Sequence, residues 1–416
     1  MAQNRHRGSG GGRAAALGRL LSLDTDPAAR AACSCGGQAR WHSLRSRQLL
    51  TAVGEVNFQR AYYVCPDCHS GHCPRDRELE VEAVQCSPGV QRMLALVGSE
   101  SSFEQGREQV ALLAGLEVTS KAVERQAEAI GADVEARQQE HNRRAKQLEL
   151  PVVCAATVPL LYLEMDGTGI PMVKAQTEGR TGKVEGQPAH TREVKLGCVF
   201  TQTTTDPEGR PVRDQDSTTY VAAIEGAEEF GLRLYTEAWR RGWSRAERKV
   251  VLGDGAVWIW NLARQHFPGS IEIVDLYHAR QHLWELSAQL FPQQPQACKR
   301  WMGRGLKLLD QGKVEALVKI LRELHPDGED LLRMVRNQAE YFQRNAPRMR
   351  YPTFRAQGLF VGSGVVEAGC KTVIGARLKR SGMFWTVRGA NAIIALRCSR
   401  LSHRFEDYWE SRSRAA

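Results

Sequence analysis

Two apolar runs that end in aspartate decide the fold class. The first is Leu160-Leu-Tyr-Leu-Glu-Met-Asp166-Gly-Thr-Gly169, and Lys249-Val-Val-Leu-Gly-Asp254-Gly repeats its pattern. Each predicts a buried strand that stops at its acid, although aspartate before glycine is also ordinary turn chemistry. Strand ends of one sheet can converge, and two unpaired carboxylates in contact repel unless a divalent cation compensates their charge. The pair therefore predicts a metal site.

Two further acids extend this pattern. Ile271-Glu-Ile-Val-Asp275-Leu-Tyr-His278 is another strand that ends in an acid, followed by a helix to about Leu290. Glu367 lies in Gly362-Ser-Gly-Val-Val-Glu367-Ala-Gly-Cys-Lys371, where Ser363 is expected to cap a helix that runs to about Lys379. Lys371 then shares a helix face with Glu367, either beside a bound phosphate or as a solvated ion pair.

Basic and aromatic residues follow Glu367. Any one of the basic side chains is either a contact to a DNA backbone or simply exposed; they are Arg377, Lys379, Arg380 and Arg388. Phe384 and Trp385 either stack on splayed bases or pack in the core, and packing is favoured.

Clustered cysteines precede these motifs. Cys33-Ser-Cys35 and Cys65-Pro-Asp-Cys68 flank a predicted hairpin, whose strands Leu49 to Val53 and Val56 to Tyr63 surround Gly54-Glu55. Two cysteine pairs joined by a hairpin predict a structural zinc site, because so small a β element buries too little apolar surface by itself. A redox pair, unligated cysteines, or a ligand drawn from His69, His72 and Cys73 remain open alternatives.

A helical stretch lies between the cysteines and the first aspartate. Apolar residues at helical spacing predict helices through Val90 to Val97, Phe103 to Leu113, and Val123 to Val134. Gly115 marks the turn, and Thr119 or Ser120 is expected to cap the third helix. This layout is typical of a helix-turn-helix reader of DNA, or of a small bundle without that role.

Composition bounds the remaining possibilities. The 416 residues are 42% hydrophobic, which suffices for packed cores, and the formal net charge of +10 favours a polyanionic partner. The sequence contains neither a membrane-length apolar run nor a signal peptide, so no membrane partner and a cytoplasmic location are expected. The basic, glycine-rich start is predicted to be a mobile tail, with an organellar transit peptide as the alternative.

The motifs together are similar to a known family. Met165-Asp-Gly-Thr-Gly-Ile-Pro, Leu252-Gly-Asp-Gly-Ala, Asp275-Leu-Tyr-His278-Ala and Gly362-Ser-Gly-Val-Val-Glu367 resemble DDE transposases of bacterial insertion sequences, specifically the Kra type. The aspartate-x-x-histidine signature is shared with the Mutator-like superfamily. The resemblance extends from about Cys33 to Trp409, but the sequence before Cys33 is shorter and simpler than in relatives. A truncated or misassigned start would put autonomous DNA recognition in question, though not the chemistry.

The resemblance implies an α/β fold: a ribonuclease H-like catalytic domain with a helical insertion. A zinc-ribbon-like module and a helix-turn-helix-like module would precede it. The predicted boundaries are a flexible basic tail at 1–32, the zinc module at 33–86, the helical module at 87–150, the first catalytic part at 151–285, the insertion at 286–355, the final catalytic part at 356–404 and a C-terminal tail at 405–416.

The resemblance also implies chemistry. Asp166, Asp254 and Glu367 match the family's catalytic triad and would hold two Mg²⁺ or Mn²⁺ ions, with Asp166 bridging them. Asp275 and His278 match its accessory signature; His278 would orient the scissile phosphate, brace Asp275 or only cap its helix. Zn²⁺ would be structural, bound by the N-terminal cysteines.

The expected reaction is cleavage at insertion-sequence ends, followed by transfer of the 3′ hydroxyl into target DNA. Expected partners are double-stranded DNA, comprising terminal inverted repeats and target, and further copies of the chain, as a homodimer or larger, beside the bacterial nucleoid. The alternatives are a transposase-derived DNA-binding protein that has lost catalysis and a ribonuclease H-like nuclease without strand transfer.

Overall fold

The computed structural model describes residues 3–22, 27–82, 84–150, 157–182 and 187–415, with side chains for residues 12–412 of these. The chain forms two compact units, residues 1–134 with 403–416 and residues 135–402, and each is described by itself. The predicted boundary at 150/151 adjoins residues 151–156, which lie outside the described residues.

The first unit contains a four-stranded antiparallel sheet in the order β1-β2-β3-β4. Its strands are β1 (Arg30–Ala32), β2 (Gln38–Thr51), β3 (Gly54–Val64) and β4 (Gly71–His72). The expected hairpin between the cysteine pairs is confirmed. The position predicted for its turn is wrong, because Thr51 pairs with Gly54, so that Gly54-Glu55 already belongs to β3.

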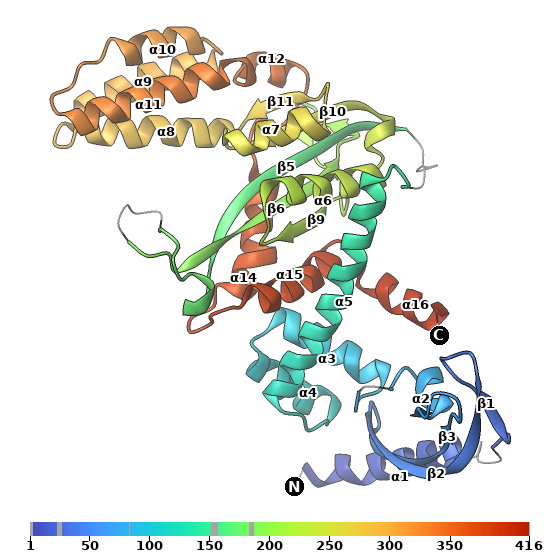
Figure 1. The fold of residues 1–416 in the computed structure, drawn as a ribbon. Coiled ribbons are helices and arrows are strands. Elements are labelled where there is room, and N and C mark those ends of the chain that lie inside the picture. The colour runs from blue at the N-terminus through green and yellow to red at the C-terminus, as the bar shows by residue number, and fades with distance from the viewer. Residues whose placement is uncertain (1–2, 23–26, 83, 151–156, 183–186, 416) are drawn as a thin grey trace. The chain divides into compact units, whose positions relative to one another are not determined.

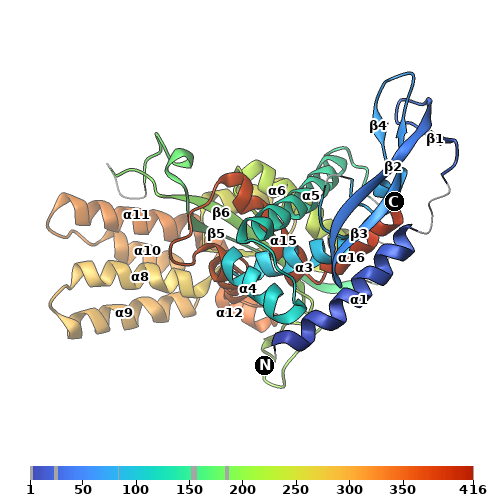
Figure 2. The same ribbon diagram turned by 90° about the horizontal axis from the view of Figure 1, so that it is seen from below.

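Helix α1 (Gln3–Ser22) covers this sheet, with Ala14, Leu17 and Leu21 packed against apolar side chains of β2 and β3 (Figure 2). The prediction of a mobile tail over residues 1–32 is therefore wrong for this segment, because glycine-rich composition concealed an apolar helix face. The C-terminal tail predicted at 405–416 is also a helix, α16 (Phe405–Ala415), in which the Tyr408 hydroxyl donates to Asp133 at 2.6 Å.

The expected helices of the 87–150 segment are confirmed as α3 (Pro88–Glu100), α4 (Phe103–Ala114) and α5 (Ser120–Lys146). Gly115 ends α4 with a φ of 66°, a conformation that glycine adopts without steric cost. The Thr119 hydroxyl accepts from the amide of Ala122 at 3.1 Å and so caps α5.

The second unit is built on a mixed five-stranded sheet in the order β11-β10-β5-β6-β9 (Figure 1). The central strand β5 pairs in parallel with β10 and antiparallel with β6, and β11 is parallel to β10. These strands are β5 (Val158–Pro171), β6 (Thr191–Thr201), β9 (Thr219–Ala223), β10 (Ala246–Gly253) and β11 (Ile271–Val274). The expected α/β class is confirmed.

Helices cover both faces of the sheet. On one face, α6 (Ala227–Arg240) approaches Gly197 of β6, and α7 (Val257–His266) approaches Gly253 at the end of β10. On the other face, α13 (Gly364–Gly369) packs on Leu196 and Tyr220. Helix α15 (Val387–Leu401) follows on that face, where Asn391 accepts from the amide of Ile224 at 2.8 Å.

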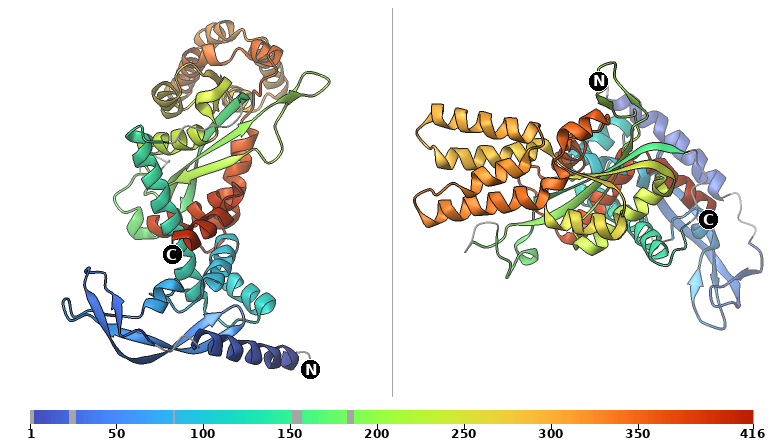
Figure 3. Two further views of the ribbon diagram at one scale, coloured as in Figure 1. Left: turned by 90° about the vertical axis from the view of Figure 1, so that its right-hand side faces the viewer. Right: turned by 90° about the horizontal axis from the view of Figure 1, so that it is seen from above.

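A helical segment separates β11 from α13. Its helices lie side by side in Figures 1 and 3, in yellow and orange. They are α8 (Leu276–Leu290), α9 (Pro295–Asp310), α10 (Val314–Arg322), α11 (Glu329–Asn345) and α12 (Tyr351–Ala356). The chain then returns to the sheet at Phe360, whose amide donates to the Tyr162 hydroxyl at 3.2 Å.

Candidate active site

Asp166 and Asp254 lie on neighbouring parallel strands at the same level. Gly253 pairs with Met165, so the next residue of each strand is one of the two aspartates. Neighbouring strands are about 4.8 Å apart and side chains alternate between faces, so the two carboxylates share one face. Asp254 follows the end of β10, as expected. Asp166 does not end its strand, because β5 continues to Pro171 against β6.

The pKa of Asp166 reports its surroundings. Burial raises this pKa and the charge of Asp254 raises it further, while hydrogen bonds from the Gly167 amide and the Cys370 thiol lower it. The Gly167 amide lies 2.6 Å from Oδ1 and the Cys370 Sγ lies 3.4 Å from Oδ2. The net effect is a raised pKa, as expected for a half-buried carboxylate beside another acid.

Glu164 is a member of the site that the sequence analysis missed. It precedes Asp166 by two residues and therefore shares its face of the sheet. It is completely buried, and its Oε2 accepts from the Val366 amide at 2.8 Å. Burial, aided by the charges of Asp275 and Glu367 and opposed by the hydrogen bond from Val366, raises the pKa of Glu164 to about 8. A glutamate within an otherwise apolar strand was the available signal.

Glu367 lies on α13, which packs on the same face as the aspartates. Its side chain is exposed, and Oε1 accepts from the Ser363 hydroxyl at 3.2 Å. Ser363 was expected to cap α13, but its side chain makes no capping hydrogen bond to this helix. Its hydroxyl instead contacts Asp275, and its amide donates to Asp275 at 3.1 Å. Asp275 thus connects the start of α8 with the segment that carries Glu367.

Asp275 and His278 occupy the first turn of α8. Asp275 is buried and caps this helix by accepting from the amides of Tyr277, at 2.6 Å, and His278, at 3.4 Å. The His278 ring lies edge-on to that of His282, with 4.9 Å between centroids. The structure therefore gives Asp275 the role of a cap and a tether.

A π-helix interrupts the helix predicted from Ser363 to Lys379. It spans Cys370–Gly375 and continues into α14 (Ala376–Leu378). Such turns often occur at functional sites, because they shift the side chains that follow. Here the π-helix contains Cys370, which contacts Asp166.

The basic residues beyond Glu367 divide into two groups. Lys371, Lys379 and Arg388 are exposed and Arg380 is half-buried; the Lys379 ammonium donates to the Thr168 hydroxyl at 2.5 Å, next to the Asp166 segment. Arg377 is completely buried and lies over the Trp385 ring at 5.0 Å. The prediction that Arg377 contacts DNA is therefore wrong for this conformation, because no solvent reaches its side chain.

Trp385 and Phe384 differ in their burial. Trp385 packs in the core and donates from Nε1 to the Leu378 carbonyl at 3.0 Å, as favoured from the sequence. Phe384 is 66% exposed, so the expectation of core packing is wrong for this residue.

The four cysteines predicted as ligands come together in the first unit. Among the described residues, they are the only group of three or more possible ligands whose ligating atoms all lie within 4.8 Å of one another. The Sγ atoms of Cys33 and Cys68 are 3.6 Å apart, as are those of Cys35 and Cys65. Zinc bound tetrahedrally at about 2.3 Å from each sulfur separates the sulfurs by about 3.8 Å. The cluster can therefore bind zinc.

The residues considered as alternative ligands lie outside this cluster. His72 points Nε2 at the Ala32 carbonyl, 3.1 Å away, and stacks on Tyr63. Cys73 is buried and precedes helix α2 (Pro74–Glu78). Neither these residues nor His69 belongs to the four-cysteine group.

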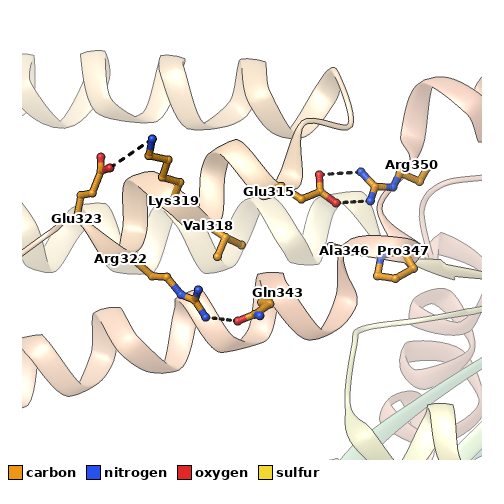
Figure 4. A pocket seen from close by; sticks show the side chains of 9 residues that line it. All are labelled: Glu315, Val318, Lys319, Arg322, Glu323, Gln343, Ala346, Pro347 and Arg350. Atoms are coloured by element: carbon orange, nitrogen blue, oxygen red, sulfur yellow. Dashed lines mark hydrogen bonds and ion pairs between the residues drawn. The ribbon is translucent and has the colours of Figure 1, made fainter.

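A cavity of about 600 Å³ lies between α10 and α11 (Figure 4). Its polar side chains pair with one another: Arg350 forms an ion pair with Glu315, Lys319 with Glu323 at 4.0 Å, and Arg322 donates a hydrogen bond to Gln343. None of the carboxylates discussed above lines it. It is therefore separate from the candidate active site.

Comparisons with known proteins return little. No protein-family model matches the chain, and no curated protein matches it. One similar solved structure is the strand transfer complex of the Drosophila P element transposase, with 8% identity and a TM-score of 0.26 over 82% of this chain and 84% of that chain. A likeness of this size carries no argument. Among the described residues, no helix has the length and apolarity to cross a membrane.

Proposed function

We propose that this chain is a DDE-class DNA transposase with a ribonuclease H-like catalytic domain. One observation carries the proposal: Asp166 and Asp254 stand side by side on parallel strands, and the helix with Glu367 packs on the same face. The strand order β11-β10-β5-β6-β9, with only β6 antiparallel to both of its neighbours, supports the ribonuclease H-like class.

The acidic residues fit hard divalent cations. Their donors are carboxylate oxygens, which Mg²⁺ and Mn²⁺ prefer, and the raised pKa of Asp166 is what a cation's charge would reverse. Among the described residues the three carboxylates do not close to within 4.8 Å as a group. The carboxylates must therefore move closer together when they share cations, and the exposed Glu367 side chain is free to do so.

The carboxylates would bind the metal ions, and the nearby basic residues would bind the DNA backbone. Asp166, between the other two, would bridge two ions, and Asp254 and Glu367 would each complete one. Bound Mg²⁺ would supply an activated water or 3′ hydroxyl and stabilise the leaving oxygen. The exposed amines of Lys371 and Lys379 and the guanidinium of Arg388 would orient the DNA backbone, because charge-assisted contacts to phosphate fix register.

The remaining assignments belong to the same proposal. The four-cysteine sheet would be a zinc-ribbon-like module and α3 to α5 a helix-turn-helix-like module, both for recognition of terminal repeats. The chain would be of the Kra type, act as a dimer or larger on element ends and target DNA, and work at the bacterial nucleoid.

Cleavage of the element's own ends tests the proposal. A labelled duplex with these ends is incubated with Mg²⁺ and either the native chain, Asp254→Asn or Asp330→Asn, a matched change at an exposed position of α11. We expect Asp254→Asn to lose about 100-fold or more of the cleavage rate while retaining DNA binding in a gel shift, and Asp330→Asn to cleave normally. Equal cleavage by all three proteins would refute the triad.

Joined products decide between a transposase and the alternatives. With target plasmid added, only a transposase converts the labelled 3′ end into a product covalently linked to the plasmid. Cleavage without joining would indicate a nuclease, and binding without metal-dependent nicking would indicate a DNA-binding protein that has lost catalysis.

A further inference from the structure

The turn that carries Asp254 is held by a residue of the helical segment. Tyr341 of α11 lies 87 positions away along the chain, and its hydroxyl donates to the main-chain carbonyl of Asp254 at 2.8 Å. The Tyr341 side chain is buried, and a phenol is protonated near neutral pH. The hydroxyl therefore keeps its proton and remains a donor.

The next residue, Gly255, packs closely against the Tyr341 ring. Its φ is +98°, and a Cβ at this position would lie 2.7 Å from ring atoms of Tyr341. A side chain is thus excluded twice, by backbone conformation and by the ring. The Asp254 carboxylate meanwhile accepts from the Ala256 amide at 2.8 Å, so the turn's geometry sets the direction of its free oxygen.

A second helix of the segment supports the tyrosine. His282 of α8 stacks on the Tyr341 ring, with 4.0 Å between centroids and 22° between planes. The His282 Nδ1 lies 2.9 Å from Oε1 of Gln338, one turn before Tyr341 on α11. Tyr341 therefore has little freedom to rotate away from the turn.

We propose that Tyr341 is a positioning residue for the candidate active site: through the Asp254 carbonyl it fixes the Asp254 carboxylate where a divalent cation is bound. The helical segment then contributes to metal binding as well as to any contact with DNA. This inference rests on the proposed function, because it takes Asp254 as a metal ligand. Strand β10 ends at Gly253, so no sheet hydrogen bonds beyond that residue define the position of Asp254.

The test compares two buried tyrosines. Tyr341→Phe removes the hydroxyl and keeps the ring, and Tyr351→Phe is the matched control. Tyr351 is fully buried on α12, and its hydroxyl has no hydrogen-bond partner among the described residues. Two quantities are measured for each full-length protein: Mn²⁺ affinity by isothermal titration calorimetry, and the Mg²⁺ concentration that half-saturates cleavage of the element ends.

We expect Tyr341→Phe to weaken Mn²⁺ binding about 10-fold and to raise the half-saturating Mg²⁺ concentration similarly, as losses outside the ligand shell do. Saturating Mg²⁺ should restore much of the cleavage, which a merely unfolded variant would not show. Tyr351→Phe should match the native chain. Gln338→Leu, which frees His282, should shift both values in the same direction by a smaller factor.

Two outcomes would overturn the inference: Tyr341→Phe matching the native chain in both measurements, or both phenylalanine variants losing affinity equally. Asp254→Asn in the same titration separates the two proposals. If it binds Mn²⁺ as tightly as the native chain, the metal-site assignment fails. If it loses binding while Tyr341→Phe does not, only the positioning role fails.

Discussion

Asp275 is the residue through which two distant segments depend on each other. Its carboxylate caps α8 and also accepts from the amide of Ser363, whose hydroxyl contacts Asp275 and Glu367. A single buried acid therefore aligns the start of one helix with the turn before another. Under the proposed function Asp275 would be a positioning group and not a metal ligand, because both of its oxygens accept hydrogen bonds from these donors.

Asp275→Ala should destabilise the second unit. The change removes the helix cap and leaves the Ser363 amide without its acceptor, which together should lower the free energy of unfolding by about 2–3 kcal/mol. Urea denaturation monitored by circular dichroism checks this value. Asp275→Asn keeps one oxygen that can cap α8 but turns its amide nitrogen toward the Ser363 donors, so it should lose less than Asp275→Ala without matching the native chain.

The matched control for that measurement is Asp330→Ala on α11, whose side chain is 93% exposed in its pair with Arg333. Exposed pairs of this kind contribute about 0–1 kcal/mol. A loss as large for Asp330→Ala as for Asp275→Ala would contradict the tethering role.

At the scale of elements, the π-helix after α13 depends on a buried arginine of α15. Arg397 donates from Nε to the Val373 carbonyl at 2.6 Å and also to the Thr372 carbonyl. These carbonyls belong to the π-turn that contains Cys370, the residue in contact with Asp166. The unusual turn is therefore stabilised from a neighbouring helix.

Arg397→Met should destabilise this arrangement, because the carbonyls of Val373 and Thr372 lose a charged donor. The expected loss is about 2–4 kcal/mol in the free energy of unfolding, measured by urea denaturation. Arg400→Met, three residues along α15, is the comparison variant, and we expect a smaller loss because Arg400 is half-buried. An equal loss in both variants would remove the special role of Arg397.

The contact between α5 and α6 predicts a pH dependence. Burial, together with the charges of Arg240 and Arg144, lowers the pKa of His141 to about 4. The unfolded chain, with an ordinary pKa near 6.5, then binds more protons than the folded chain between these values. The stabilisation from neutral His141 is thus present above about pH 6.5 and is lost as pH falls through about 4.

His141→Gln should reduce this acid sensitivity. The melting temperature of the native chain should fall more steeply between pH 6.5 and pH 4 than that of the variant, measured by differential scanning calorimetry in matched buffers. His325→Gln, at an exposed histidine, should retain the native slope. Parallel curves for all three proteins would exclude His141 as the cause.

At the scale of the whole molecule, the two compact units differ in what stabilises them. The first unit has small separate apolar clusters, one of which is around Cys33, Ala39, Tyr63 and Cys65 at the four-cysteine group. The second unit has a continuous sheet core with helices on both faces. Zinc binding should therefore contribute to the stability of the first unit and not to that of the second.

Zinc removal checks this difference. The native chain should contain one zinc per molecule by elemental analysis, and Cys65→Ser should contain less. The melting transition of the first unit should fall by about 10 °C or more in the variant, while that of the second unit is unchanged. A shift of both transitions by the same amount would contradict the assignment.

Local sequence patterns predicted much of the local structure. The apolar runs predicted β10 and β11 with their terminal acids, and helical spacing predicted α3, α4 and α5. The cysteine spacing predicted the four-sulfur group, because a metal site of this kind consists of two short motifs and a hairpin. Each of these features depends on residues that are close along the chain, where periodicity and turn chemistry dominate.

Long-range packing decided the rest. Strand β5 continues beyond Asp166 because it pairs with β6. Arg377 is buried against Trp385, and the turn at Asp254 is fixed by a hydrogen bond from Tyr341. None of these pairings leaves a periodic signal, since each joins segments whose spacing along the chain is arbitrary. The sequence therefore predicts which residue types form the candidate site. Their strand register, their burial and their hydrogen-bond partners depend on how distant strands and helices pack against one another.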